Sequence, residues 1–338
     1  EKQMKNPLDY KSEKRLLFQF AVPSIIAMLV GSLYNIVDQF FIGHSVGELG
    51  NAATNISFPL SISCVAIALL FGIGGASAFN ISMGAGEKKK AVYYLGNSAI
   101  MLFSCGVVLC VITLMFLEPL LRFFGSPNNV LDYAKTYTGI IAFGFPFLIL
   151  TTGGGHLIRA DGRPNVSMVC NLTGAILNTF LDALFVFGLN MGMRGAALAT
   201  IIGQVLSAIM VIWCLSHCKT VSVGKEHLRV RKKIISRIIS LGTAPFSNQL
   251  AMMVVQIVMN KSLKYYGSIS VYGEAVPIAC AGIITKVNQV FMSFVIGISQ
   301  GLQPITSFNY GAKKYKRVKT AYTFAIKCGF ALAVVAFL

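Results

Sequence analysis

Charged residues are scarce in this chain of 338 residues: Asp, Glu, Lys and Arg together make up 12% of it, about half the usual share for a soluble domain. Hydrophobic residues make up 55%, and the mean hydropathy is +0.69. This balance argues against a soluble protein. Apolar runs near or above the roughly 18 residues that a membrane-spanning helix needs recur along the chain, and the alternation of a membrane β-barrel is not seen. The sequence therefore predicts an all-α, polytopic membrane protein built as a helical bundle.

Catalytic and metal-binding motifs are also missing. No Ser/His/Asp set, HExxH or P-loop occurs, and the four histidines are scattered near the ends of apolar runs and in loops, which argues against a membrane-embedded enzyme. GIGGAS at 72–77 lies inside an apolar run with no strand before it, so it is not a dinucleotide loop. Most of the eight cysteines lie in apolar runs, and Cys214, His217 and Cys218 lack the second ligand pair of a structural metal site. We expect no enzyme activity and no cofactor.

Acidic residues are the rarest charged group: 12 Asp and Glu stand against 29 Lys and Arg, which gives a net charge of +17. In a soluble protein this excess would suggest nucleic acid as a partner, but no basic–aromatic motif is present. Cytoplasmic loops of membrane proteins are rich in Lys and Arg. The expected partner is the lipid bilayer, and no nucleic acid is expected.

Nine apolar segments are predicted, at 16–42, 53–82, 93–117, 134–158, 165–188, 195–216, 236–260, 275–308 and 320–338. Alternate loops, starting with the N-terminal stretch, hold 22 of the 29 basic residues, and the loops of the opposite side hold five. This bias predicts a multi-pass protein of the cell membrane with a cytoplasmic N-terminus. The last segment reaches Leu338 without a polar closure, so either the span is complete there or the bundle is unfinished. We expect a fragment of a longer bundle.

Two weak similarities indicate an internal repeat. GGASAFNISMGAG at 74–86 resembles GLQPITSFNYGAK at 301–313, and FAVPS at 20–24 resembles GTAPF at 242–246. Six spans before the repeat would place both halves in the same orientation, as in parallel-repeat transporters. We therefore predict an N-terminal lobe at 1–218 with spans 1–6, a basic cytoplasmic linker at 219–235, and an incomplete C-terminal lobe at 236–338 with spans 7–9.

Two carboxylates lie inside apolar segments, where a charge is costly unless it is protonated, paired or hydrated. Asp38 has Tyr34 and Asn35 one helical turn before it, and Asp182 has Asn178 four residues before it, so each set shares a helix face. A buried carboxylate that takes up a proton or Na⁺ changes its charge, which is one way for an ion gradient to drive transport. The competing interpretation places each Asp at a membrane interface, where its charge costs little.

A substrate cavity is predicted from polar and charged residues of the central spans. Lys286 is near the middle of its segment and faces either this cavity or, if its stem snorkels, the interface. Asn260 takes the position of Asp38 in the repeat, so the ion chemistry is expected in the first half only. The residues assigned to the cavity are Tyr34, Asn35, Gln256, Asn260 and Lys286.

Several stretches together resemble the multidrug and toxic compound extrusion (MATE) transporters of prokaryotic type. They are AVP at 21–23, YNIVDQFFIG at 34–43, GGASAFNISMGAGEKKKA at 74–91, LIRADGRP at 157–164, and LNTFLDALFVFG at 177–188 followed by MGMRGAALAT at 191–200. The resemblance implies two lobes of six spans each and an antiporter that exports drugs, often organic cations, in exchange for H⁺ or Na⁺. It also implies a coupling-ion site, which could be a sodium site, at Asp38, Asn178, Asp182 and Thr200, with Tyr137 as a weaker match.

Function thus has one leading interpretation and one runner-up. The first is an ion-coupled exporter of drug-like molecules that acts as a monomer by alternating access. The second, from the same superfamily, is a flippase for lipid-linked oligosaccharide. A flippase would favour a more cationic cavity for the diphosphate, and the central spans carry one Lys. The sequence does not choose between H⁺ and Na⁺.

Overall fold

The computed structural model describes the backbone of residues 7–124, 126, 128–271 and 275–337, and the side chains of these except at 7, 48, 129, 225, 260, 261, 264, 268, 275–283, 286 and 337. Every regular element in this part is a helix. The elements are α1 (Pro7–Tyr10), α2 (Glu13–Val46), α3 (Glu48–Gly84), α4 (Lys88–Met115), α5 (Leu117–Phe123), α6 (Asn128–Ile141), η1 (Ala142–Gly144), α7 (Phe145–Ala160), α8 (Pro164–Asp182), η2 (Ala183–Gly188), α9 (Gly192–Ser216), η3 (Lys225–Leu228), α10 (Lys232–Ile269), α11 (Ala275–Gly311) and α12 (Tyr315–Phe337).

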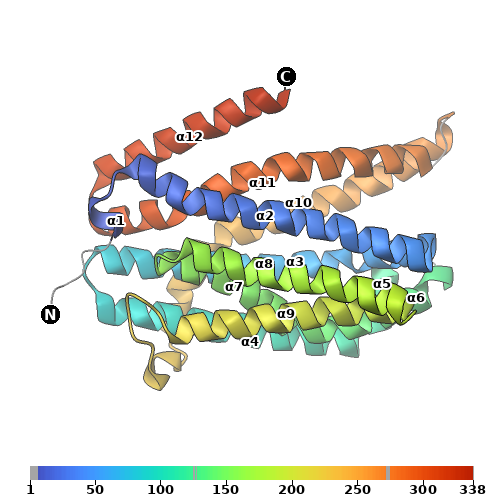
Figure 1. The fold of residues 1–338 in the computed structure, drawn as a ribbon, viewed down its shortest axis with the longest axis horizontal. Helices are drawn as coiled ribbons and strands as arrows, with labels where there is room; N and C mark the ends of the chain where they lie inside the picture. The colour runs from blue at the N-terminus through green and yellow to red at the C-terminus, as the bar shows by residue number, and fades with distance from the viewer. Residues whose placement is uncertain (1–6, 125, 127, 272–274, 338) are drawn as a thin grey trace.

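The long helices run side by side along one axis, with the chain reversing direction at each turn (Figure 1). Eight helical stretches in the described part are long and apolar enough to cross a bilayer, and α11, with 37 residues, lies among them. An apolar helix hides its backbone polar groups from lipid by bonding them internally, which is why such runs fold as helices. The all-α, membrane-spanning fold is confirmed, and the nine predicted segments correspond to these helices.

The fourth predicted segment, 134–158, forms two helices joined by a short turn. Helix α6 passes into the 3₁₀ turn η1, and α7 then begins with Pro146 at its second position. Proline is well suited to a first helical turn because its missing N–H has no intrahelical partner there. Ala142 and Gly144 of the turn are buried, whereas the Phe143 side chain is 59% exposed, so the interruption reaches the surface of the bundle.

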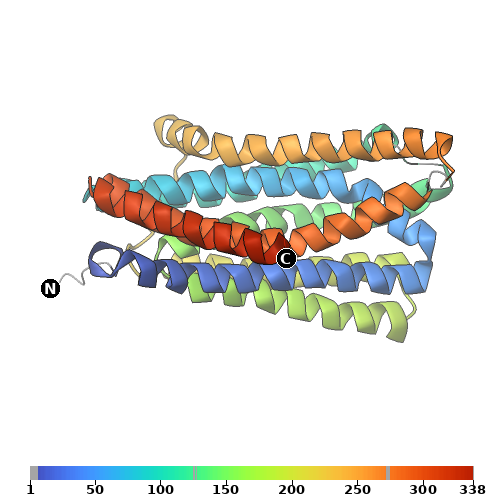
Figure 2. The same cartoon turned by 90° about the horizontal axis from the view of Figure 1, so that it is seen from above.

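Helices α3 to α9 pack into one compact group, and α10, α11 and α12 lie beside it (Figure 2). The first group has a continuous core whose largest buried side chains include Phe79, Leu95, Ile149 and Leu157. A second, smaller core joins the start of α2 to the end of α11 and to α12. Helix α2 packs on α8 of the first group and on α11 of the second, so it belongs to both.

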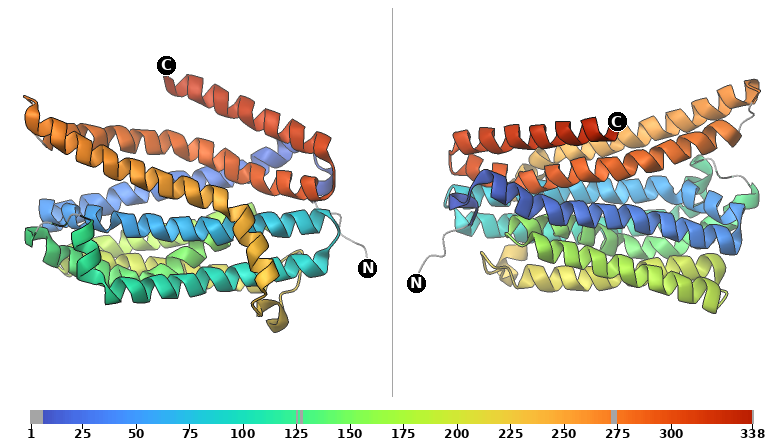
Figure 3. Two further views of the ribbon diagram at one scale, coloured as in Figure 1. Left: turned by 180° about the vertical axis from the view of Figure 1, so that it is seen from behind. Right: turned by 45° about the horizontal axis from the view of Figure 1, so that its top comes forward.

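The seam between the two groups is formed by α2 with α11 and by α3 with α10, and the helices diverge away from the end that carries the basic loops (Figure 3). Glycine allows the backbones to touch there. A Cβ at Gly84 would lie 2.0 Å from the carbonyl oxygen of Phe308, and one at Gly311 would lie 2.0 Å from that of Ile81. These two contacts are equivalent under the predicted repeat, which aligns residues 81 and 84 with 308 and 311.

The basic stretch between α9 and α10 is tied to the first group at two points. Asn97 on α4 donates to the carbonyl oxygens of His227 and Arg229 at 3.2 Å each and accepts from the backbone N–H of Arg231 at 2.9 Å. The Arg231 guanidinium also stacks over the Tyr93 ring at 3.8 Å. Helix α10 begins at Lys232, inside the predicted linker, which is therefore shorter and more ordered than a free tether.

Candidate ion-coupling site

Asp38 and Asp182 face each other across the contact between α2 and α8. Asp182 is the last residue of α8 and is fully buried, and Asp38 is 8% exposed. The two carboxyl groups are close enough to interact electrostatically. Both are enclosed by helices; whether they lie near a membrane interface stays a separate question.

Two carboxyl groups in one enclosed cluster constrain the charge that the cluster can hold. Ionised carboxylates have acceptor atoms only, so two of them repel each other unless a proton or another cation lies between them. Oδ1 of Asp38 and Oδ1 of Asp182 are both buried and have no hydrogen-bond partner among the described residues. Buried polar atoms normally have partners, so these two oxygens make a place where a cation is attracted.

The amide of Asn178 connects Asp182 to the next helix. With its oxygen and nitrogen assigned from the hydrogen-bond network, Asn178 donates to Asp182 Oδ2 at 3.0 Å and accepts from the backbone N–H of Thr200 at 2.9 Å and its hydroxyl at 3.3 Å. The Thr200 hydroxyl has one proton, which it can donate instead to the carbonyl oxygen of Ala196 at 3.0 Å. All of these side chains are buried, so α8, α9 and α2 meet in one polar cluster inside an apolar bundle.

A turn of π-helix follows Asp182 directly, as η2 from Ala183 to Gly188. Its wider i→i+5 bonding includes the bond from the N–H of Leu189 to the carbonyl oxygen of Leu184 at 2.9 Å. Such turns occur often at functional sites because they rotate the residues on either side relative to a straight α-helix. The sequence predicted one continuous segment over 165–188 and gave no signal for this turn.

Two tyrosines complete the surroundings of the carboxyl pair. Tyr137, on α6, is buried and lies within electrostatic range of Asp38 and Asp182. Tyr34, one turn before Asp38, is half-buried and interacts with the same two carboxyls. The structure therefore brings together five of the predicted residues, namely Asp38, Tyr137, Asn178, Asp182 and Thr200. Tyr34, predicted for the cavity, lies with them.

The other predicted cavity residues are not part of this cluster as far as the structure describes them. Asn35 is exposed and donates to the carbonyl oxygen of Gly31 at 2.9 Å. Gln256 is half-buried on α10. The side chains of Asn260 and Lys286 lie outside the described residues, so their placement in a cavity stays a prediction.

Polar contacts across the seam went unpredicted. Ser32 on α2 and Ser293 on α11 share a hydrogen bond of 3.1 Å, and Gln303 on α11 donates to Ser77 on α3 at 2.9 Å. Serine is common in membrane helices, so the presence of these serines in the sequence did not predict the contacts. The pairing depends on which helices become neighbours.

Comparison with known proteins supplies a family for this arrangement. The MatE family matches residues 23–184 and 245–338. The multidrug export proteins MepA of Staphylococcus haemolyticus and Staphylococcus aureus (strain NCTC 8325 / PS 47) are each 27% identical to the chain; the matches cover 90% and 92% of the chain and 66% and 68% of those proteins. The chain thus spans about two thirds of the length of these curated relatives.

Two solved structures resemble the whole chain. One is an outward-facing multidrug resistance MATE transporter of the MOP superfamily, and the other is a MOP superfamily transporter from Pyrococcus furiosus that is described as having a binding pocket of reverse polarity. Each has a TM-score of 0.90 and 25% identity and covers 100% of this chain and 74% of its own.

Proposed function

Since the chain belongs to the MatE family of membrane transporters, we propose that the protein of which these 338 residues are a part exports drug-like organic molecules, often cations, in exchange for H⁺ or Na⁺. The relatives described as multidrug export proteins support the export activity. The observation that carries the ion coupling is the buried pair of Asp38 and Asp182, each with a carboxyl oxygen that has no hydrogen-bond partner within the described part of the chain.

The pair needs a cation when α2 and α8 are packed as they are here. Two ionised carboxylates in contact and away from water repel each other strongly, because the interior screens charge poorly. A proton shared by the pair removes one charge, and Na⁺ would be attracted by both carboxylates and by neighbouring oxygens. The Thr200 hydroxyl is a nearby oxygen, and Asn178 orients Asp182 through its amide nitrogen. Loss of the ion would push α2 away from α8.

Helix α2 would carry that change to the seam, since it packs on α8 with one face and on α11 with another. The bond between Ser32 and Ser293 lies about one and a half turns from Asp38 along α2. Ion binding thus favours one arrangement of the lobes and drug binding favours another, and each ligand shifts the equilibrium only by its differential affinity for the two. In this proposal the basic loops, including the N-terminal stretch, face the cytoplasm.

Efflux from everted vesicles of cells that express the full-length protein tests the proposal. A pH gradient and a sodium gradient are imposed separately, on the wild type, Asp182→Asn and Asp38→Asn. The control is Asp132→Asn, the same chemical change at an exposed carboxylate. We expect one gradient to drive efflux, both site variants to lose it by at least about tenfold, and the control to keep it.

Two outcomes contradict the proposal. Gradient-driven efflux that persists in both site variants would remove the carboxyl pair from the coupling mechanism. Efflux that no gradient drives, with protein that is folded and correctly inserted, would favour the flippase interpretation or a ligand of another kind.

A further inference from the structure

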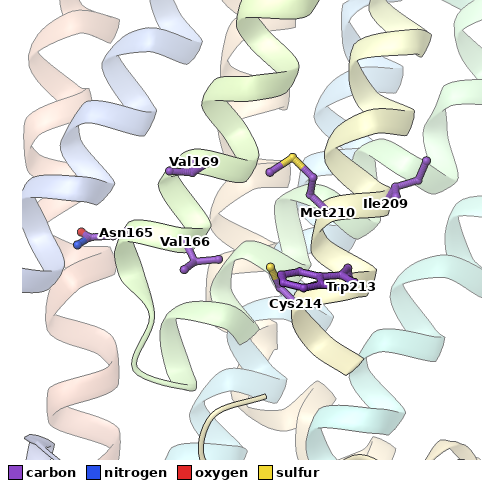
Figure 4. A pocket seen from close by; sticks show the side chains of 7 residues that line it. All are labelled: Asn165, Val166, Val169, Ile209, Met210, Trp213 and Cys214. Carbon is purple, nitrogen blue, oxygen red and sulfur yellow. The ribbon is translucent and has the colours of Figure 1, made fainter. Parts of the chain in front are cut away.

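An apolar groove lies on the outer surface of the first helix group, away from the carboxyl site. It runs between the start of α8 and the end of α9 and has a volume of about 480 Å³. Figure 4 shows its lining, with Val166 and Met210 directed into the space between the two helices and the Trp213 ring lying beside Cys214. The residues that line it are Asn165, Val166, Val169, Ile209, Met210, Trp213 and Cys214.

The rims of this groove are apolar side chains on the surface. Val169 is 45% exposed, Ile209 57% and Trp213 62%. Both helices are apolar enough to span a membrane, so these side chains face hydrocarbon rather than water. In a bilayer such a groove is occupied by an apolar ligand, and the phospholipid acyl chain is the most abundant one there.

One end of the groove lies at the membrane–water boundary. Trp213 is in the last turn of α9, and Asn165 is the second residue of α8, so the end of one helix meets the start of the other there. Trp213 packs against His217 with ring centroids 5.2 Å apart. Tryptophan is enriched at the level of lipid headgroups, where its apolar ring and its polar N–H are both accommodated.

The loops at this end present positive charge. The buried carboxylate at this end, Asp161, is bonded to the backbone N–H groups of Lys219 (2.8 Å) and Thr220 (3.0 Å), to the Thr220 hydroxyl, and to Arg163 at 2.7 Å. It therefore leaves the side chain of Lys219 free to act on the surroundings, and that side chain is exposed. An anionic headgroup is attracted to such a site, because Lys and Arg near a bilayer bind acidic lipids electrostatically.

We propose that this groove binds an anionic phospholipid, with an acyl chain between α8 and α9 and its phosphate beside Trp213, His217 and Lys219. The apolar lining favours the acyl chain, and the cationic end selects the headgroup. A second copy of the chain is a poorer occupant, because the groove is narrow and its charged end would face the same charge on the copy.

Trp213, which lines the groove, is the only tryptophan of the 338 residues. Its fluorescence therefore reports what binds in the groove. The full-length protein, with any tryptophan outside these 338 residues replaced by phenylalanine, is purified and reconstituted in vesicles of a zwitterionic phosphatidylcholine, and acyl-brominated phosphatidylglycerol or acyl-brominated phosphatidylcholine is added in increasing mole fraction. Bromine quenches a tryptophan that it contacts. We expect half-maximal quenching at a mole fraction at least about threefold lower for the anionic lipid.

Matched variants test which residue causes the preference for the anionic lipid. Lys219→Gln is compared with Lys316→Gln, which removes the same charge at an exposed position in another basic loop. We expect Lys219→Gln to reduce the preference and Lys316→Gln to keep it. Both side chains are exposed, so neither change threatens folding. A third variant, Val166→Phe, fills the groove and is expected to weaken quenching by both lipids.

Several results would overturn the proposal. Equal quenching by the two lipids would indicate a non-selective lipid shell. A preference that both lysine variants reduce equally would indicate diffuse surface charge, and one that Lys219→Gln leaves intact would displace the headgroup from this end. Relief of quenching by an organic cation, but not by unbrominated phosphatidylglycerol, would make the groove a drug-binding surface instead.

Discussion

The carboxyl cluster and the seam between the two helix groups are held together by different kinds of contact. The cluster lies within contacts of α2, α8 and α9 and consists of buried carboxyl, amide and hydroxyl groups bonded to one another. The seam at Gly84 and Gly311 consists of backbone against backbone, with no space for a Cβ. Close approach of this kind is typical of membrane helix packing, where small residues replace the hydrophobic driving force.

Under the proposed mechanism the two regions have different tasks. In the carboxyl cluster a bound ion would change the balance of charge. The seam holds many weak contacts, each of which costs little to break. Helix α2 takes part in both regions, and the following substitutions test whether the two regions differ in kind.

Replacing Asn178 with Leu should give the largest effect after loss of the carboxyls themselves. The change removes the donor at 3.0 Å from Asp182 and the acceptor for Thr200. A hydrogen bond to a charged group contributes about 1.5–3 kcal/mol, so the rate of gradient-driven efflux should fall by about tenfold to a hundredfold. The matched control is Asn171→Leu on the same helix, whose amide donates to the carbonyl oxygen of Ser167. Equal losses in both variants would mean a general effect on α8.

Replacing Gly84 with Ala should disturb the seam and leave the cluster intact. The new methyl would lie 2.0 Å from the Phe308 carbonyl oxygen, so the helices must move apart, at a cost of about 1–3 kcal/mol. We expect a lower thermal unfolding midpoint and greater reactivity of cysteines introduced along the seam. In the control Gly31→Ala the methyl meets nothing within 4 Å, and better helix propensity should keep or raise the midpoint. A Gly84→Ala protein as stable and as closed as wild type would disprove the close contact.

Replacing Ser32 with Ala removes one hydrogen bond of 3.1 Å to Ser293 across the seam. A neutral hydrogen bond contributes about 0.5–1.5 kcal/mol. The equilibrium between lobe arrangements should shift by roughly threefold to tenfold, measurable as a change in distance distribution between spin labels on α2 and α11. Ser63→Ala, whose hydroxyl bonds the carbonyl oxygen of Pro59 within α3, should leave that distribution unchanged.

Glu118 provides the smallest expected effect and lies outside both regions. Hydrogen bonds from Lys135 and then Arg122 lower the pKa of its carboxyl group. A lowered pKa stabilises the fold above the pKa of the unfolded chain, and this contribution is lost as the pH falls through the folded value. Glu118→Gln should therefore lower the thermal midpoint slightly near neutral pH, with the difference vanishing in acid. The side chain is 43% exposed, so a difference as large as that of Gly84→Ala would be inconsistent with this ranking.

Much of the fold could be predicted because lipid imposes a strict rule. A run of apolar residues must become a helix in a bilayer, so the segment edges and the charge bias of the loops are readable along the chain. The pairing of Asn178 with Asp182 was also predictable, since a spacing of four places two side chains on one face. In the structure the fourth segment, 134–158, is divided by a 3₁₀ turn, and Pro146 is the second residue of the helix that follows it.

The sequence by itself determined the membrane-spanning helical fold, the family and the rare polar residues inside the apolar segments, because composition and periodicity are local properties. Only the tertiary structure decided which helices become neighbours. It brought Asp38 against Asp182 and Tyr137 near both, placed Gly84 against Phe308, and set the π-turn after Asp182. These features depend on contacts between residues far apart in the chain, and no local pattern encodes them.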